Sequence, residues 1–497
     1  MSGPTHVHNL LEGPAGERVA LVAGEDQLSY DGFRDRVAVF ADRLRDVGIA
    51  RGDRVAVQLP KSIGECVALF AIARAGAAFV PIHPSLRPAQ VRHIVEDCGA
   101  RVLVTEPGLR HILGDTLTVI SEISAESLLL LLPERAGPAP PEDLAAILYT
   151  SGSTGLPKGV MLSHANLIAG TRIVRNYLGI TPDERILSVL PLAFDYGLNQ
   201  LLTAVEQGAR LVLLDVRFGD EVVRAIETHR ITGLAGVPTL WTLLTRAAPR
   251  LAKADLTSLR YITNSGGAVP METVARLRQA LPHTHIVLMY GLTEAFRSTW
   301  LPPDELEARP GSMGKAIPET QIFAVTPEGR RTRAGEPGIL MHRGPTVSLG
   351  YWNRPDETAK VLVPDPLDPL GPPLCRSGDL VVEDAEGYFT FVGRDDAMIK
   401  TSGFRVSPGE VEAALMATEA FGAVAVIGLP DASLGQRLHA IGVPASDGPS
   451  IEMALRSVRE VVAPHMVPRT VEMVAALPVT PNGKIDYKRL AAERENG

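Results

Sequence analysis

The chain has 497 residues, of which 45% are hydrophobic and 21% are charged, and its formal net charge is −8. A chain of this length is expected to form about two to four lobes, and this composition excludes disordered and fibrous proteins. Because the charge balance is acidic and no block is rich in Lys or Arg, we expect no nucleic acid partner.

The apolar runs are too short to cross a membrane, which takes about 20 residues. The longest purely aliphatic run is Leu128–Leu132. The first residues lack the basic and apolar regions of a signal peptide. Cys66, Cys98 and Cys375 lie far apart and form no C-x-x-C pair, a pattern typical of reducing compartments rather than of structural zinc. We therefore expect a cytoplasmic protein that does not bind membranes.

Apolar runs of strand length alternate with amphipathic segments through the first 300 or so residues. The predicted strands are Arg54–Leu59, Phe79–Ile82, Arg101–Thr105, Leu144–Thr150, Ile186–Leu190, Arg210–Leu214, Leu259–Thr263 and His285–Tyr290. The predicted helices between them include Tyr30–Val47, Ile63–Ala75, Pro88–Cys98 and Met271–Leu281. This alternation indicates an α/β architecture with parallel sheets.

The pattern changes after about residue 305, where Gly, Pro and short strands such as Gly338–His342 and Gly387–Val392 predict a β-rich subdomain. A helix is then predicted to start at Ser407, with Pro408 in the first turn and Glu410 closing a capping box.

A further strand, Ala423–Gly428, belongs to a last lobe of roughly 100 residues. The predicted fold class is α/β. A large N-terminal domain (residues 1–394) holds parallel-type sheets and the β-rich subdomain, and a small, mobile α+β C-terminal domain (residues 395–497) follows.

The strand Leu144–Thr150 runs directly into TSGSTGLPKG, which ends at Gly159. Glycines let backbone N–H groups turn toward an anion, hydroxyls add donors and Lys158 adds a charge, so the string predicts a polyphosphate cradle. The candidate nucleotide-binding residues here are Thr150, Ser151, Gly152, Ser153, Thr154, Gly155 and Lys158. Pro157 stands where a Walker A loop needs its second glycine, which argues against a kinase-type P-loop enzyme.

TSGSTGLPKG, followed by GVMLSHANL, resembles the signature of the adenylate-forming superfamily, which includes acyl-CoA synthetases, non-ribosomal peptide synthetase adenylation domains and luciferases. Further blocks match in the same order and cover about residues 19–490. They are RAGAAFVPI (74–82), YGLTE (290–294), SGD (377–379), GRDDAMIK (393–400) and PNGKI (481–485).

The resemblance implies two half-reactions. A carboxylate first attacks the α-phosphorus of ATP, in the presence of Mg²⁺, giving an acyl-adenylate and pyrophosphate. A thiol then attacks the acyl carbon and AMP leaves. Either the phosphopantetheine of a carrier protein or coenzyme A would supply that thiol.

By resemblance, Thr293 contacts the α-phosphate, and Glu294 holds Mg²⁺, a cation that prefers carboxylate oxygen. Asp379 would accept the ribose hydroxyls and Arg394 would support the ribose or phosphate. The adenine would stack on Tyr290, beside a turn after another strand; the residues implied there are Gly266, Gly267, Ala268 and Gly291.

Lys484 is implied to be the catalytic lysine that reaches the carboxylate and α-phosphate during adenylation only. Asp396 matches the family's hinge position. Rotation of the last lobe about it would withdraw Lys484 and bring Lys400 and Gly403 to a tunnel for the thiol.

Asp195 is the candidate recognition residue for the acid. It stands in LPLAFDYG, where amino-acid-activating members of the family typically carry Phe-Asp and where the Asp pairs with the substrate's amino group. A buried carboxylate is costly without a cation. Alternatively, Asp195 is satisfied by backbone N–H groups or by Arg297.

The other candidate pocket residues, Tyr196, Asn199, Trp241, Ser265 and Phe296, suggest a compact substrate. We therefore expect activation of a small amino acid, such as proline, and its transfer to a separate acyl or peptidyl carrier protein. The alternatives are a stand-alone AMP-forming acyl-CoA ligase for a small acyl or aryl acid and, more remotely, a non-catalytic nucleotide-binding homologue.

Overall fold

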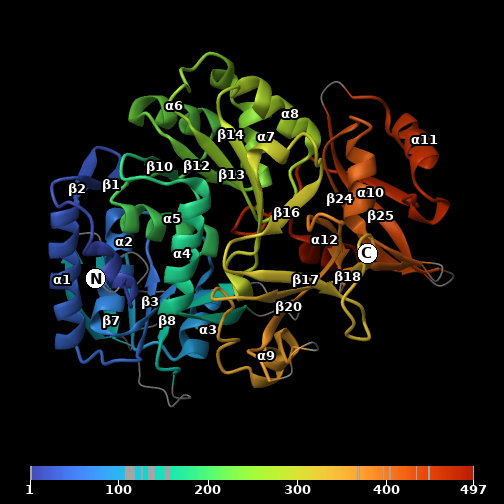
Figure 1. Ribbon diagram of the computed structural model, residues 1–497. Coiled ribbons are helices and arrows are strands. Elements are labelled where there is room, and N and C mark those ends of the chain that lie inside the picture. The colour runs from blue at the N-terminus through green and yellow to red at the C-terminus, as the bar shows by residue number, and fades with distance from the viewer. Residues whose placement is uncertain are drawn as a thin grey trace.

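The structure is a computed structural model (Figure 1). It describes residues 3–106, 118–124, 127–131, 140–150, 157–365, 368, 370–395, 397–401, 404–431, 434–445 and 448–495. Within this part of the chain, no helix is both long enough and apolar enough to cross a membrane.

The largest sheet has 14 strands in the described part of the chain and combines two kinds of pairing. Its parallel half consists, in spatial order, of β14 (His285–Tyr290), β13 (Tyr261–Asn264), β12 (Gly233–Gly236), β10 (Arg185–Ser188), β11 (Arg210–Leu213) and β1 (Val19–Ala23), with β2 (Asp26–Ser29) antiparallel at the edge. Its antiparallel half consists of β15 (Thr299–Leu301), β16 (Ser312–Ala316), β21 (Phe389–Arg394), β20 (Leu374–Glu383), β18 (Pro337–Arg343) and β17 (Gln321–Val325), and β19 (Leu362–Val363) pairs with β20.

A second sheet lies in the N-terminal half of the chain. Its strands are β6 (Thr118–Ser124), β7 (Ser127–Leu131), β5 (Val102–Thr105), β3 (Arg54–Gln58), β4 (Ala78–Pro81), β8 (Leu144–Thr150) and β9 (Lys158–Ser163). β8 and β9 form an antiparallel hairpin in which Thr150 pairs with Lys158. Lys158 therefore opens a strand that the sequence pattern did not predict.

Helices cover both faces of these sheets. The helices and short 3-10 turns of this part are η1 (Val7–Leu11), α1 (Tyr30–Asp46), α2 (Ile63–Ala75), α3 (Pro88–Cys98), α4 (His164–Leu178), α5 (Asp195–Gln207), α6 (Gly219–His229), α7 (Pro238–Ala247), η3 (Pro249–Ala252), α8 (Met271–Ala280), η4 (Thr293–Ala295), η5 (Pro303–Glu305) and α9 (Pro355–Val361). One buried core joins α1, α2, α4 and α5 to the inner faces of β3 and β11, and a second joins α6, α7 and α8 to the other face of the large sheet. The predicted α/β class is confirmed.

The C-terminal lobe, orange to red in Figure 1, has a sheet and a core of its own. Its strands are β22 (Ile399–Thr401), β23 (Phe404–Val406), β24 (Phe421–Asp431), β25 (Gly435–Pro444) and β26 (Thr470–Met473), and its helices are α10 (Pro408–Met416), α11 (Ile451–Val461), η6 (Pro464–Met466) and α12 (Tyr487–Glu495). β21, in the large sheet, ends at Arg394. The boundary between residues 394 and 395 stays a prediction.

The start of α10 differs from the prediction in one detail. Ser407 is the N-cap residue and Pro408 opens the helix, but no side-chain capping bond forms, so the predicted capping box with Glu410 is wrong. The Ser407 hydroxyl instead donates to the carbonyl of Val392 in β21. A tertiary hydrogen bond to the neighbouring lobe replaces the local one.

Candidate active site

Lys484 is carried to the N-terminal lobe by a tight turn. The Gly483 N–H donates to the Thr480 carbonyl (2.9 Å), and the Thr480 N–H donates to the Lys484 carbonyl (2.7 Å). Gly483 has φ +75°, and a side-chain carbon there would lie 3.1 Å from Oγ1 of Thr239 at the start of α7. Glycine is therefore needed both for the turn and for its approach to the other lobe.

The Lys484 ammonium lies among the residues predicted to bind substrate and nucleotide. Nζ lies 5.4 Å from the centre of the Phe194 ring, and a side-chain carbon at Gly266 would lie 3.0 Å from Cε of Lys484. Although solvent still reaches Lys484, the surrounding protein lowers the pKa of its ammonium by desolvation. Three carboxylates oppose this shift, in the order Asp195, Asp379 and Glu294.

Asp195 is the first residue of α5 and is almost fully buried, at 4% exposure. Its Oδ2 lies 3.5 Å from Nη1 of Arg297, whose side chain is 2% exposed. Burial raises the pKa of the Asp195 carboxyl, and Arg297 and then Lys484 oppose that shift. Both partners considered for Asp195 are therefore present, since hydrogen bonds from the backbone N–H groups of Asp195 and Tyr196 also lower its pKa.

Two of the remaining pocket candidates, Tyr196 and Phe296, lie next to this ion pair. The Arg297 guanidinium lies over the Tyr196 ring at 4.7 Å and the Phe296 ring at 5.5 Å. Tyr196 and Asn199 also line a cavity of about 30 Å³ on the inner side of α5, which is room for about one water molecule. Ser265 is buried after β13.

Tyr290, at the end of β14, is joined to Asp379 in the neighbouring part of the large sheet. The Tyr290 hydroxyl donates to Oδ2 of Asp379, and Oδ1 of Asp379 lies 3.2 Å from Nη1 of Arg394. Burial raises the pKa of Tyr290 well above its usual value, so the phenol is a neutral donor. The three residues predicted to hold the adenine and ribose thus form one connected group.

Thr293 and Glu294 lie in η4, one turn beyond β14. Oε1 of Glu294 accepts a hydrogen bond from the Tyr351 hydroxyl (2.6 Å), and its carbonyl accepts from the Ser348 N–H (2.8 Å). The described residues contain no group of three or more His, Cys, Asp or Glu that could hold a metal by itself. One carboxylate fits Mg²⁺, which often binds through one or two carboxylates together with substrate phosphates.

The predicted phosphate cradle is described at its two ends only. Thr150 closes β8 and Lys158 opens β9, whereas Ser151, Gly152, Ser153, Thr154 and Gly155 lie outside the described residues. Nζ of Lys158 forms an ion pair with Oε2 of Glu357 on α9 at 2.5 Å. Lys158 and Lys360 together lower the pKa of Glu357 to about 2.

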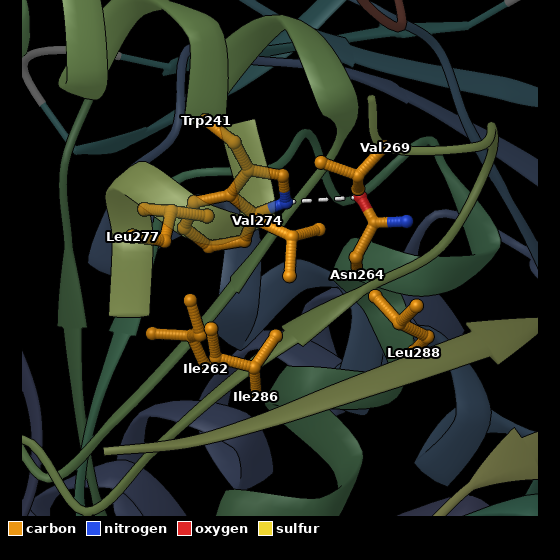
Figure 2. Close-up of a pocket in the computed structure, with 8 residues that line it drawn as sticks. All are labelled: Trp241, Ile262, Asn264, Val269, Val274, Leu277, Ile286 and Leu288. Atoms are coloured by element: carbon orange, nitrogen blue, oxygen red, sulfur yellow. Dashed lines mark hydrogen bonds between the residues drawn. The ribbon is translucent and has the colours of Figure 1, made fainter. Parts of the chain in front are cut away.

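The turn Gly266–Gly267–Ala268 follows β13, and Gly266 has φ +83°. The Asn264 side chain donates to the Gly267 carbonyl (2.9 Å) and accepts from the Trp241 indole N–H (2.9 Å). Figure 2 shows this indole pointing at Asn264 between α7, α8 and the sheet.

Trp241 does not line the acid pocket, so this prediction is wrong. Its ring packs with Ile262, Val274 and Leu277 in the core on one face of the large sheet, whereas Tyr196 packs with Ala235 in a different core. Neighbouring residues of β12 point to opposite faces, as in any strand. Trp241 instead supports the turn through Asn264.

The predicted hinge is described only in part. Asp396 and Gly403 lie outside the described residues, and the backbone at Lys400 belongs to β22. Their roles stay predictions.

Sequence reasoning missed the partners of the predicted charged residues, which are Tyr351 for Glu294 and Glu357 for Lys158. It also missed His342 of β18, which is fully buried and stacks near Tyr290 at 6.2 Å. The two neighbouring aromatic residues Tyr351 and Trp352 indicate a buried segment, but no local sequence pattern indicates that Tyr351 contacts Glu294.

Lys484 thus lies near the carboxylates of Asp195, Asp379 and Glu294, in an arrangement that agrees with an enzyme that activates a carboxylate with a nucleotide. The chain belongs to the AMP-binding enzyme family, whose main domain matches residues 12–352 and whose C-terminal domain matches residues 410–484.

Curated relatives extend over nearly the whole chain. A feruloyl-CoA synthase from an Amycolatopsis species is 35% identical over 477 residues, covering 93% of each chain. An L-proline–[L-prolyl-carrier protein] ligase from Streptomyces coelicolor is 32% identical, covering 95% of this chain and 93% of the relative.

Solved structures are similar over the same length. ATP-bound MatB from Rhodopseudomonas palustris has a TM-score of 0.87 and 26% identity, covering 99% of both chains. The anthranilate CoA ligase AuaEII in complex with anthranoyl-AMP also has a TM-score of 0.87 and 26% identity, covering 100% of this chain and 98% of that one. The chain is thus an adenylate-forming, AMP-forming acid–thiol ligase.

Proposed function

We propose that this ligase activates a small amino acid and passes it to the phosphopantetheine thiol of a separate carrier protein. In the first step a carboxylate oxygen of the amino acid bonds to the α-phosphorus of ATP, and the bond to pyrophosphate breaks. In the second step the thiol sulfur bonds to the acyl carbon and AMP leaves. Lys484 stabilises the negative charge that develops in the first step.

The observation that carries this proposal is the buried carboxylate of Asp195. Burial raises its pKa even though Arg297 lies 3.5 Å away and Lys484 is near. One further cation would therefore stabilise the charged carboxylate, because desolvation remains the largest influence on it. The ammonium of an amino acid supplies that cation beside the reacting carboxyl group.

The nucleotide assignments belong to the same proposal. Thr293 contacts the α-phosphate, and Glu294 supplies a carboxylate oxygen to Mg²⁺, which neutralises phosphate charge when bound. The remaining proposed nucleotide contacts are Thr150, Ser151, Gly152, Ser153, Thr154, Gly155, Lys158, Gly266, Gly267, Ala268, Tyr290, Gly291, Asp379 and Arg394.

A second candidate function is that of an acyl-CoA ligase acting on a small acyl or aryl acid without an amino group. One observation favours it: Asp195 already has Arg297 as a partner, so a substrate ammonium is not required to compensate its charge. The similarity to feruloyl-CoA synthase agrees with this alternative.

Substrate-dependent exchange of pyrophosphate into ATP distinguishes the two. We would test the twenty amino acids beside short fatty acids and aryl acids. We expect exchange with an amino acid, and proline belongs in the panel because of the similarity to a prolyl-carrier ligase. Exchange only with acids that lack an amino group would favour the second candidate. Mass spectrometry of carrier protein and of coenzyme A after the reaction would then identify the thiol.

An Asp195→Ala variant tests the recognition residue. We expect amino acid activation to fall at least about 100-fold while ATP binding persists, because a hydrogen-bonded charge is lost from a buried site. Asp183→Ala is the matched control, since the Asp183 side chain is 88% exposed. Unchanged activity of Asp195→Ala on the true substrate would refute the role of Asp195.

A further inference from the structure

Only one nitrogen of the Arg297 guanidinium has a charged partner among the described residues. Nη1 faces Asp195 at 3.5 Å, but Nε and Nη2 have no hydrogen-bond partner among the residues that the structure describes. The side chain is 2% exposed, so bulk water does not take the place of a partner. A buried donor without an acceptor is costly, and more so when it carries a charge.

The unpaired edge has a specific geometry. Nε–H and Nη2–H point the same way and form the two-donor fork that holds both oxygens of a carboxylate. A single oxygen can accept from both donors, as Oε1 of Glu184 does from Nε and Nη2 of Arg260, but only an anion also compensates the buried charge.

Arg297 lies within the substrate pocket that the proposed function assigns. Its guanidinium packs on Tyr196 and near Phe296. On another side it approaches Gly291, where a side-chain carbon would lie 3.6 Å from Nη1. Arg297 therefore also lies close to the proposed nucleotide-binding segment after β14.

Arg297 and Lys484 share one nearby carboxylate, although Lys484 also couples to Asp379 and Glu294. Arg297 and Lys484 are cationic, and Asp195 is the anion that couples to both of them. A reacting carboxylate beside Lys484 and an ammonium beside Asp195 would leave Arg297 without an anion of its own. A second carboxylate on the substrate supplies it, and each charged group then has an opposite partner.

We propose that Arg297 binds a second carboxylate of the substrate through its Nε and Nη2 edge, and that the acid is a small amino dicarboxylic acid. This rests on the proposed function and narrows it. Proline lacks a second carboxylate and would leave the fork unpaired.

The wild-type enzyme tests this with matched pairs of acids in the pyrophosphate exchange assay. Aspartate is compared with 2-aminobutyrate, and glutamate with 2-aminopentanoate, so that a methyl group replaces the second carboxylate. Succinate keeps both carboxylates but lacks the ammonium. We expect kcat/KM for one amino dicarboxylic acid to exceed that of its methyl partner at least about 100-fold.

Variants of Arg297 test whether the preference for the dicarboxylic acid depends on this side chain. Arg297→Gln removes the charge, and Arg297→Lys keeps the charge but lacks the fork. For both we expect a loss of at least about 10-fold in kcat/KM for the dicarboxylic acid, seen mainly in KM. The methyl partner should lose less, because it never occupied the fork, so the ratio of the two kcat/KM values falls. Arg276→Gln is the control, because that side chain is 48% exposed and pairs with Glu272. If Arg297→Gln fails to fold, Arg297→Lys still answers the question.

The outcomes separate this inference from the function on which it rests. A preference for the amino dicarboxylic acid that disappears in Arg297→Lys supports it. Equal exchange with the methyl partner, or exchange with proline that Arg297→Lys leaves unchanged, overturns it while amino acid activation stands. Exchange only with acids that lack an amino group overturns the proposed function, and this inference with it.

Discussion

The ammonium of Lys158 lies 2.5 Å from Oε2 of Glu357, although 199 residues separate the two in the sequence. The same ammonium lies 5.7 Å from the ring centre of Tyr351, whose hydroxyl donates to Glu294. The predicted phosphate-binding lysine and the predicted metal ligand are thus connected through one aromatic side chain. In this arrangement Glu357 pairs with the Lys158 ammonium that a polyphosphate would otherwise bind.

The first prediction is that Glu357 competes with the phosphates of ATP for Lys158. In Glu357→Gln, Lys158 loses its carboxylate and is available to the phosphates, so we expect KM for ATP to fall about 2- to 5-fold. Steady-state kinetics with varied ATP measures this. Lys360→Gln is the matched control, because Lys360 also binds Glu357 (2.6 Å) and its removal leaves the Lys158 pair intact. A rise in KM for ATP would mean that Glu357 instead positions Lys158 for the nucleotide.

The second prediction concerns Lys484. In Lys484→Ala we expect adenylation to fall by about two to four orders of magnitude, because the cation acts where charge develops on the carboxylate and α-phosphate. Transfer of the acyl group from pre-formed acyl-adenylate to the thiol should persist. Single-turnover assays of each half-reaction distinguish the two effects.

Lys488→Ala is the control for Lys484, since Lys488 is exposed on α12. Equal loss of both half-reactions in Lys484→Ala would contradict an alternation of the C-terminal lobe between two positions. Full adenylation in the variant would contradict the assignment of Lys484 itself.

Local patterns predicted many of the elements. The strands Leu144–Thr150 and His285–Tyr290 and the helices Ile63–Ala75 and Pro88–Cys98 match the structure at both ends. Capping residues explain this agreement for one helix, because Ser62 caps the N-terminus of α2 and Gly76 ends the helix in a left-handed conformation.

What the sequence could not predict depends on contacts between distant segments. Ser407 hydrogen-bonds to Val392 instead of forming the predicted capping box, and Trp241, expected in the acid pocket, packs in the core with Ile262 and Leu277. Asp195 and Arg297 were predicted as a possible pair, but only the folded structure shows that the start of α5 lies next to Arg297 and that two guanidinium nitrogens have no partner among the described residues.

The third prediction is a loss of stability at mildly acidic pH through His164. Nδ1 of His164 accepts the Val7 N–H (3.1 Å), and burial lowers the pKa of this imidazole from 6.5 to about 4. Because the unfolded chain then binds a proton that the folded chain rejects, stability is complete above about pH 6.5 and falls as the pH drops toward 4. Between pH 8 and pH 5 the loss is about 2 kcal/mol.

Thermal unfolding at several pH values measures this effect. His164→Gln removes the titrating ring, so its unfolding temperature should fall less between pH 8 and pH 5 than that of the wild type. If the unfolding temperatures of the two proteins fall equally between pH 8 and pH 5, His164 is not the group that destabilises the fold at acidic pH.

The fourth prediction concerns Trp241, whose indole N–H donates to the Asn264 side chain (Figure 2). In Trp241→Phe the Asn264 side chain loses the indole N–H that orients it, and its own bond to the Gly267 carbonyl weakens. We expect a cost of about 1 kcal/mol in stability and a rise of about 5-fold in KM for ATP, with kcat nearly unchanged because Trp241 does not touch the acid pocket. Asn264→Ala should reproduce the change in KM. A variant that loses stability but keeps its KM for ATP would show that Trp241 only fills the core between α7 and α8.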